Sequence, residues 1–171
     1  EQRRISGVGL ALRRGRGDNE MNRFRYDVYL HVECPIQKRP AEMLEFSESN
    51  AATWREEIEY RRPAAASLIG LTNARTIDAV AMANWLRKET TERSLDALRR
   101  LLISETEQAR HPEDLAQWAE SLGYAVAMFE SLDGLGWIDA VLVRHDVDAD
   151  PRQLLPACRN PQPSTHSATP T

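Results

Sequence analysis

The chain of 171 residues is poor in cysteine and aromatic residues and has no long apolar run, and each shortage excludes a class of protein. Its two cysteines, Cys34 and Cys158, stand 124 positions apart, which argues against a disulfide framework or a cysteine-rich zinc site. No apolar run approaches the ~20 residues of a membrane span, and no signal-peptide core follows the basic start. We therefore expect a cytoplasmic chain with reduced thiols and no membrane partner.

Charge of neither sign dominates. Hydrophobic residues make up 42% of the chain and charged residues 28%, which excludes collagen, coiled coil and wholly disordered chains. The charge is polarised, because residues 1–25 hold seven arginines and three acids, whereas the rest holds 15 basic and 23 acidic residues. A basic end attracts phosphates, but arginines beside an acidic body more often form a solvated face, so no nucleic-acid partner is expected.

An antiparallel pair of strands is predicted within residues 1–33. Residues 8–12 are apolar, and residues 24–32 alternate strictly between apolar and polar. The positions that share one face of the second strand are Phe24, Tyr26, Val28, Leu30 and Val32. We expect this face to be buried. The polar segment 13–22 between the strands is rich in residues that tolerate turn geometry.

A connection and a small α/β lobe are predicted next. Prolines and a string of acids break the apolar pattern over residues 34–62, which favours a connection with at most a short helix. The lobe, residues 63–146, is predicted to have the order β-α-α-α-β-β. It begins with a buried strand at 64–71, and helices then follow Asn73 and Ser94.

The third helix of the lobe has the strongest local signal, in HPEDLAQWAESLGY. Pro112 suits the first helical position, the next two acids favour the positive end of the helix dipole, and Gly123 suits a left-handed cap. Apolar strands at 124–129 and 137–143 follow and are expected to pair. Residues 147–171 have the proline-, serine- and threonine-rich composition of a linker or disordered tail.

The sequence contains no complete motif for a metal site, a catalytic nucleophile or a glycine-rich nucleotide-binding loop. The four histidines form no i, i+4 pair and have no C-x-x-C partner, so no metal site is expected. No G-x-S-x-G presents a nucleophile. None of the three G-x-G pairs has a third glycine, and none is expected between a strand and a following helix. We therefore expect these glycines to serve ordinary turns and strands. These pairs are Gly7/Gly9, Gly15/Gly17 and Gly134/Gly136.

The polar loop before the second strand is the main candidate for function. Asn19 and Glu20 could accept hydrogen bonds from an amine, and loop arginines such as Arg23 and Arg25 could hold a phosphate or carboxylate in bidentate fashion. The simpler interpretation is that Asp18 and Asn19 make the turn while the arginines solvate it. From the residues alone, this simpler interpretation is favoured.

A second candidate lies in LIGLTNARTIDAV, a strand followed by a polar turn and a helix. An anion could sit at that helix N-terminus. Capping by Thr72 or Asn73, with Arg75 on the surface, is favoured because such caps are common. Trp85 and Trp118 fall on helical stripes and are expected to pack at the core or its edge.

Four motifs in this order resemble one known family. RRGRGDNEMNRFRYDVYLHV, GLTNAR, HPEDLAQWAESLGYAVAMFES and WIDAVLV are similar to the C-terminal part of methyltransferase domains of non-ribosomal peptide synthetases, which are often inserted in an adenylation domain. The family's R-[FY]-R-Y-D-V falls on residues 23–28 here. Thr72 replaces the usual proline before N-A-R, and Ile138 replaces an aromatic residue. The resemblance spans about residues 5–145.

The resemblance implies methyl transfer from S-adenosylmethionine to an aminoacyl group, usually its amine, held as a thioester on the phosphopantetheine arm of a carrier protein. It implies that residues 1–33 are the terminal antiparallel strand pair of a class I methyltransferase sheet. Asn19, Glu20, Arg23 and Arg25 would line the acceptor entrance. In the family the strand, acidic-glycine loop and helix that bind S-adenosylmethionine precede these strands, so no cofactor-binding residue is expected in this chain.

Two hypotheses follow. In the first, the chain is a segment of a synthetase methyltransferase that is inactive alone, and its partners are the remainder of the methyltransferase and adenylation domains and the carrier protein. In the second, it is a non-catalytic scaffolding lobe of a multidomain synthetase. A strand pair cut from its sheet would expose an apolar face and an unpaired edge unless it found other partners within the chain.

Overall fold

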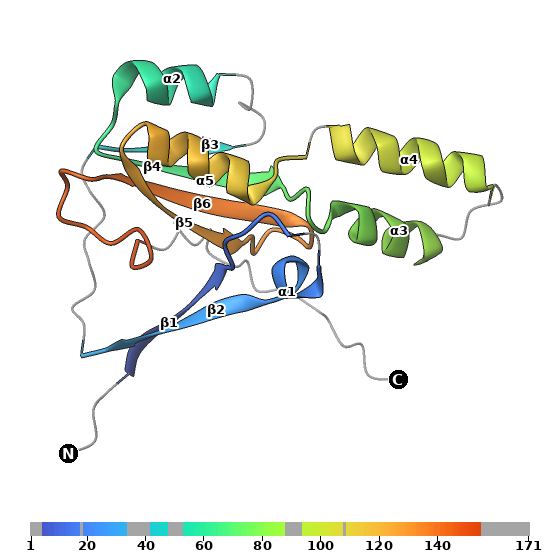
Figure 1. The fold of residues 1–171 in the computed structure, drawn as a ribbon, viewed down its shortest axis with the longest axis horizontal. Coiled ribbons are helices and arrows are strands. Elements are labelled where there is room, and N and C mark those ends of the chain that lie inside the picture. Colours follow the sequence, from blue (N-terminus) through green and yellow to red (C-terminus); the bar gives the residue numbers. More distant parts are fainter. Residues whose placement is uncertain are drawn as a thin grey trace, which may run out of the picture.

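The computed structural model shows a mixed α/β protein with two sheets and five helices among the residues that it describes (Figure 1). These residues are 5–17, 19–33, 42–47, 53–87, 94–107 and 109–154. The predictions about Cys34, Cys158, Asp18 and the tail beyond residue 154 lie outside them. Within the described ranges, no helix has both the length and the apolar character that crossing a membrane requires.

The predicted antiparallel strand pair is present and forms a separate two-stranded ribbon. It consists of β1 (Ile5–Leu12) and β2 (Tyr26–Val32), joined by a loop that contains the one-turn helix α1 (Glu20–Arg23). β2 begins two residues later than predicted because Phe24 ends α1, donating its backbone N–H to the Glu20 carbonyl.

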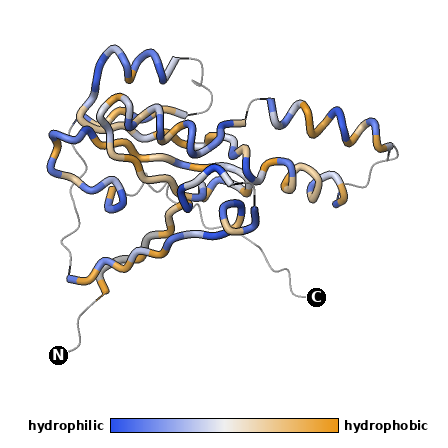
Figure 2. Tube along the Cα trace, in the orientation of Figure 1, coloured by the Kyte–Doolittle hydropathy of each residue, from blue (hydrophilic) through white to orange (hydrophobic). Residues whose placement is uncertain are grey.

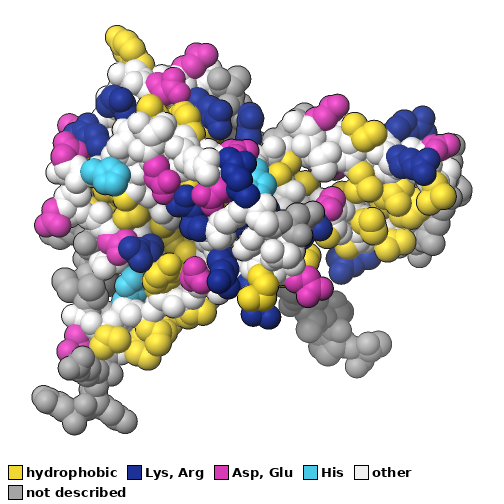
Figure 3. All heavy atoms as spheres, in the orientation of Figure 1, with side chains coloured by type: hydrophobic (Ala, Val, Ile, Leu, Met, Phe, Trp, Pro, Cys, Tyr) yellow, Lys and Arg dark blue, Asp and Glu magenta, His cyan; other side chains and the backbone are white. Residues whose placement is uncertain are grey.

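The apolar face of the ribbon is exposed, and the prediction that it is buried was wrong. Val8, Val28 and Leu30 are 58%, 60% and 57% exposed. Only the end near the loop is covered, where Leu12 is buried and Tyr26 packs partly buried against the core. Figure 3 shows hydrophobic side chains gathered along this ribbon. The alternation of apolar and polar residues in β2 defines an apolar face, but that face is buried only where another part of the protein packs on it. Among the described residues, such packing occurs only at the end near the loop.

The second sheet has four strands in the order β3-β4-β6-β5. Its strands are β3 (Met43–Ser47), β4 (Ala65–Thr72), β5 (Tyr124–Glu130) and β6 (Trp137–Arg144). β4 pairs in parallel with β3 and antiparallel with β6, and β5 pairs antiparallel with β6 as predicted. Every residue of β4 is buried, which explains its near-continuous apolar run.

Residues 34–62 contain the short helix that the prediction allowed and, in addition, a strand that it did not include. β3 is followed by α2 (Trp54–Arg61), which crosses over to the parallel strand β4. Parallel neighbours require such a crossover. β3 escaped prediction because it has only five residues, and its assignment depends on pairing with β4, which lies far along the sequence.

Two layers cover the sheet. On one face, α2 and α5 (Pro112–Ser121) bury Trp54, Ile58 and Leu115 against β4, β5 and β6. On the other face, Ala11 and Tyr29 of the ribbon pack with Val141, Val143 and Leu154. Packing therefore continues past residue 146, where Val147, Ala149 and Leu154 contact this cluster, beyond the predicted start of the tail.

The remaining helices, α3 (Ile77–Arg87) and α4 (Leu95–Glu107), form a pair that projects from one end of the sheet (Figure 1). Only Ile77 and Ala81 of α3 are buried, and α4 buries no residue. Figure 2 shows hydrophobic stretches on both helices. The start and end of α5 are as predicted, with Pro112 in the first turn and Gly123 at φ +79°.

Candidate functional site

Three polar motifs that lie far apart in the sequence meet beside the ribbon. The loop between β1 and α1 lies against the turn before α3 and the first turn of α5. Five charged side chains make these contacts, and together we call them the arginine–carboxylate cluster: Arg14, Arg23, Arg75, Asp78 and Glu113. The cluster fixes the candidate loop on the lobe.

Arg75 is the buried centre of the cluster, not the surface residue that the sequence favoured. Arg75 as a whole is only 6% exposed. Nη1 donates to the carbonyl oxygens of Arg13 and Asn22 at 2.7 and 3.2 Å, and Nη2 donates to that of Gly15 at 2.5 Å. Burial lowers the pKa of Arg75, and the nearby Glu113 carboxylate opposes that shift. One guanidinium thus holds the loop at three backbone positions.

The turn before α3 places Arg75 in this position. Asn73 is 4% exposed, and its Oδ1 accepts from the backbone N–H of Arg75 at 3.0 Å. Its carbonyl accepts from the N–H groups of Thr76 and Ile77. Asn73 therefore accepts with its side chain and its carbonyl at the start of the segment that leads into α3, as the predicted cap would, although α3 itself begins at Ile77.

Glu113 joins the loop to α5. Arg14 donates to its carboxylate in bidentate fashion, from Nε at 3.0 Å and from Nη2 at 2.7 Å, and the Gly15 N–H donates to the same carboxylate at 2.8 Å. These hydrogen bonds, the Arg14 pair above all, hold the pKa of Glu113 at about 2, although burial acts in the opposite direction. Arg14 also pairs with Glu120, about two turns further along α5, at 2.6 Å.

Arg23 joins α1 to α3. Its Nη2 donates to both carboxylate oxygens of Asp78, at 2.6 and 2.7 Å, and its Nε donates to the Arg75 carbonyl at 2.7 Å. Burial raises the pKa of Asp78, but the hydrogen bonds from Arg23 and from the Ala79 N–H outweigh it and leave the pKa below its usual range. The cluster is therefore continuous from α5 through the loop to α3.

The four candidate residues of the loop take different positions. Asn19 caps α1, with its Oδ1 accepting from the Asn22 N–H at 3.1 Å, and Glu20 is exposed at the first position of that helix. Arg25 is exposed between α1 and β2, whereas Arg23 points inward to α3. Asn19, Glu20 and Arg25 thus remain accessible on a loop that Arg23 anchors.

Bidentate binding of a carboxylate, which the sequence analysis suggested for a ligand, occurs inside the chain. Arg14 performs it on Glu113. Neither Glu113 nor Asp78 was predicted as a partner of the loop, and the acids at the start of α5 were expected only to favour the helix dipole. A usable signal was present, since both acids stand in the first turn of a helix. Their partners in the loop could not be identified, because about 50 to 100 residues separate each pair.

The residues present do not fit as a cradle for S-adenosylmethionine. Gly15 and Gly17 do lie between a strand and a helix, contrary to expectation, but α1 has four residues and the Gly15 N–H is already engaged by Glu113. Gly134 and Gly136 lie between β5 and β6, two antiparallel strands. In the described ranges, no group of three or more histidine, cysteine or acidic side chains is arranged to hold a metal ion.

Comparisons with known proteins do not identify a family. No protein-family model matches the chain, and no curated protein matches it.

The Glu113 interactions predict an acid-sensitive stability. The pKa of this carboxyl is lowered from 4.5 to about 2 in the folded chain, so its contribution is complete above pH 4.5 and is lost as the pH falls towards 2. Because Arg14 is 41% exposed, solvent screening limits this contribution to about 1–2 kcal/mol. Urea unfolding should show Glu113→Gln less stable by this amount at pH 7, with the difference vanishing near pH 2. A constant difference across this range would contradict the assignment.

Proposed function

We propose that the chain is the C-terminal segment of an S-adenosylmethionine-dependent methyltransferase domain of a non-ribosomal peptide synthetase. In this proposal it acts on a carrier-bound aminoacyl group, most often methylating the amine. The cofactor cradle is supplied by a portion of the methyltransferase that is not in this chain, and the segment is inactive alone. The motif resemblance over about residues 5–145 is the basis of the proposal.

The exposed apolar face of the ribbon is the structural observation that supports it best. On this face Val8 stands opposite Leu30 and Leu10 opposite Val28, and all four side chains are more than half exposed. A two-stranded ribbon is marginal alone, and a contiguous apolar patch marks a surface that binds another protein element. A terminal strand pair of a larger sheet would have both properties.

The position of the candidate loop is also compatible with a role at the acceptor entrance. It lies at one end of the ribbon, where α1 interrupts the path from β1 to β2. The arginine–carboxylate cluster fixes its inner side, so the accessible side of α1 would hold a constant position next to the added sheet. Glu20 lies on this accessible side and can accept a hydrogen bond from an acceptor amine.

Replacement of Glu20 in the intact parent domain tests this role. We expect Glu20→Ala to lower the rate of methyl transfer to a carrier-bound aminoacyl group by about 10-fold or more, as for loss of a positioned hydrogen-bonding group. The measurement is the rate of S-adenosylmethionine-dependent product formation by mass spectrometry. Glu56→Ala on α2 is the matched control, because Glu56 is also an exposed acid in the first turn of a helix. Equal rates for both variants and the parent would reject the role.

Two further observations test the proposal as a whole. The parental reading frame should contain an E/D-x-G-x-G motif between a strand and a helix within about 200 residues before Glu1. The chain alone should show no S-adenosylmethionine binding in isothermal titration. A micromolar one-to-one site on the isolated chain would overturn the proposal.

A non-catalytic scaffolding lobe is the second candidate, and one specific observation favours it. Arg14 and Arg23, the loop arginines best suited to hold a substrate carboxylate or phosphate, are paired with Glu113 and Asp78. With these guanidinium groups engaged, the cluster can serve to fix the ribbon on the lobe. An unchanged transfer rate in Glu20→Ala, together with loss of binding to neighbouring synthetase domains in ribbon variants, would favour this candidate.

A further inference from the structure

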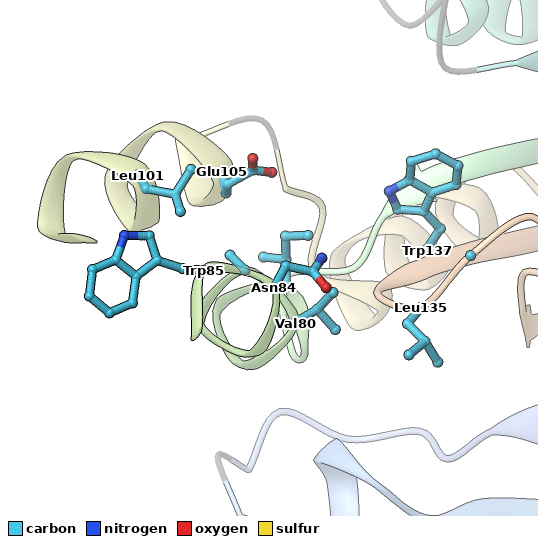
Figure 4. A pocket seen from close by; sticks show the side chains of 10 residues that line it. Val80, Asn84, Trp85, Leu101, Glu105, Leu135 and Trp137 are labelled. Atoms are coloured by element: carbon cyan, nitrogen blue, oxygen red, sulfur yellow. The ribbon is translucent and has the colours of Figure 1, made fainter. Parts of the chain in front are cut away.

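A pocket of about 440 Å³ lies between α3, α4 and the turn that joins β5 to β6 (Figure 4). Its volume falls within the range of small-molecule sites. The residues that line it are apolar except for two: Ile77, Val80, Ala81, Asn84, Trp85, Leu101, Glu105, Gly134, Leu135 and Trp137. It shares no lining residue with the arginine–carboxylate cluster, so it is a separate site on the lobe.

Two indole rings stand at opposite ends of this pocket. Trp85 extends from α3 beneath Leu101, and Trp137 extends from the start of β6 (Figure 4). Trp137 is 38% exposed, so its ring can be reached by a ligand from solvent. Indole faces attract both apolar groups and cations. The ends of the pocket therefore favour a flat or cationic group.

The two polar side chains of the wall point into the space between the helices and Trp137 (Figure 4). They are the amide of Asn84 and the carboxylate of Glu105. Neither forms a hydrogen bond or ion pair with any other residue in the described ranges. Asp78, the acid on α3, is held by Arg23, whereas Glu105 lies on α4. Glu105 is thus the charge that faces the pocket, and no lining residue is basic.

We propose that this pocket binds a small apolar amine, an aryl-alkyl ammonium ion whose ring packs on the Trp137 side and whose ammonium group pairs with Glu105. The Asn84 side-chain oxygen accepts a second hydrogen bond from the same ammonium. An acid of the same size is disfavoured because its carboxylate would face Glu105. This inference does not depend on the proposed function.

Titration of the whole chain with 2-phenylethylammonium tests the proposal. The chain has four tryptophans, so the indole N–H signals of a nitrogen-15 correlation spectrum report the site and its controls together. Trp54 and Trp118 contact each other on α2 and α5 and serve as internal controls. We expect saturable shifts at Trp85 and Trp137 only, with a Kd of about 1 mM, as for a ligand of this size. Trp85→Phe and Trp137→Phe assign the two signals.

Matched probes and variants separate charge recognition from simple apolar binding. We expect 3-phenylpropionate to bind at least about 5-fold more weakly, and Glu105→Gln to weaken 2-phenylethylammonium about 3- to 5-fold while leaving 2-phenylethanol unchanged. Glu107→Gln, an exposed acid on α4 outside the pocket, should change nothing. Absence of saturable shifts, equal affinity for the three probes, or shifts confined to Trp54 and Trp118 would each overturn the proposal.

Discussion

Replacing Arg75 by methionine is expected to destabilise the chain by about 2–4 kcal/mol and to release the β1–α1 loop from the lobe. Methionine fills much of the same volume but donates no hydrogen bond. The carbonyls of Arg13, Gly15 and Asn22 then lose the donors that the guanidinium supplies. Since these groups are partly buried, their loss costs more than that of a surface pair.

Two measurements check this expectation. Urea unfolding gives the change in free energy, and tryptic cleavage at Arg14 and Arg16 reports release of the loop, because both bonds become accessible when the loop detaches. Arg75→Lys should recover less than half of the lost stability, since one ammonium group cannot reach all three carbonyls in the guanidinium geometry. Arg87→Met, at the exposed end of α3, is the control. Equal effects of Arg75→Met and Arg87→Met would contradict a central role for Arg75.

The double variant Val28→Lys, Leu30→Lys is expected to leave the isolated chain folded and, under the function proposed above, to prevent assembly of the parent methyltransferase domain. Both side chains are more than half exposed, so the free energy of unfolding of the isolated chain should change by less than about 0.5 kcal/mol. Its binding of an anilinonaphthalene dye should fall because the apolar patch is interrupted. In the proposed parent the rest of the methyltransferase sheet would cover the ribbon, and burying two unpaired lysines there is strongly unfavourable.

The test compares the effect of the double variant in the isolated chain with its effect in the proposed parent domain. Soluble yield and methyl-transfer activity of the parent should fall by at least about 10-fold, while the isolated chain keeps its unfolding midpoint. Leu95→Lys, Leu132→Lys is the matched control, because these leucines are 71% and 85% exposed and lie outside the ribbon. A parent domain that tolerates lysines on the ribbon as well as the control would show that this face stays in water.

The sequence was sufficient to predict the elements whose ends and faces depend only on neighbouring residues. Pro112, His111 and Gly123 set the ends of α5 through fixed φ, a side-chain cap and a left-handed residue. The buried run of β4 and the alternation of β2 were also recognisable. These features depend on neighbours within one or two turns, which the sequence displays directly.

The candidate site was only partly predictable, because its contacts join residues that lie far apart in the sequence. The loop around Asn19 and Glu20 was singled out correctly as a polar excursion before β2, but the buried role of Arg75 was not. Arginine is rarely buried, and the three carbonyls that accept from it become neighbours only when β1 packs beside β5. Whether an arginine lies in water or at the centre of a loop depends on contacts across more than 50 residues.

The sequence by itself determined five of the six strands, the three helices of the lobe, the apolar face of β2, and where α5 begins and ends. Only the tertiary structure decided that β3 pairs with β4, that the arginine–carboxylate cluster joins the loop to the lobe, and that the ribbon's apolar face is exposed. The physical reason is that secondary structure follows from hydrogen bonds and side-chain periodicity within a segment. Burial and charge pairing instead depend on which surfaces meet.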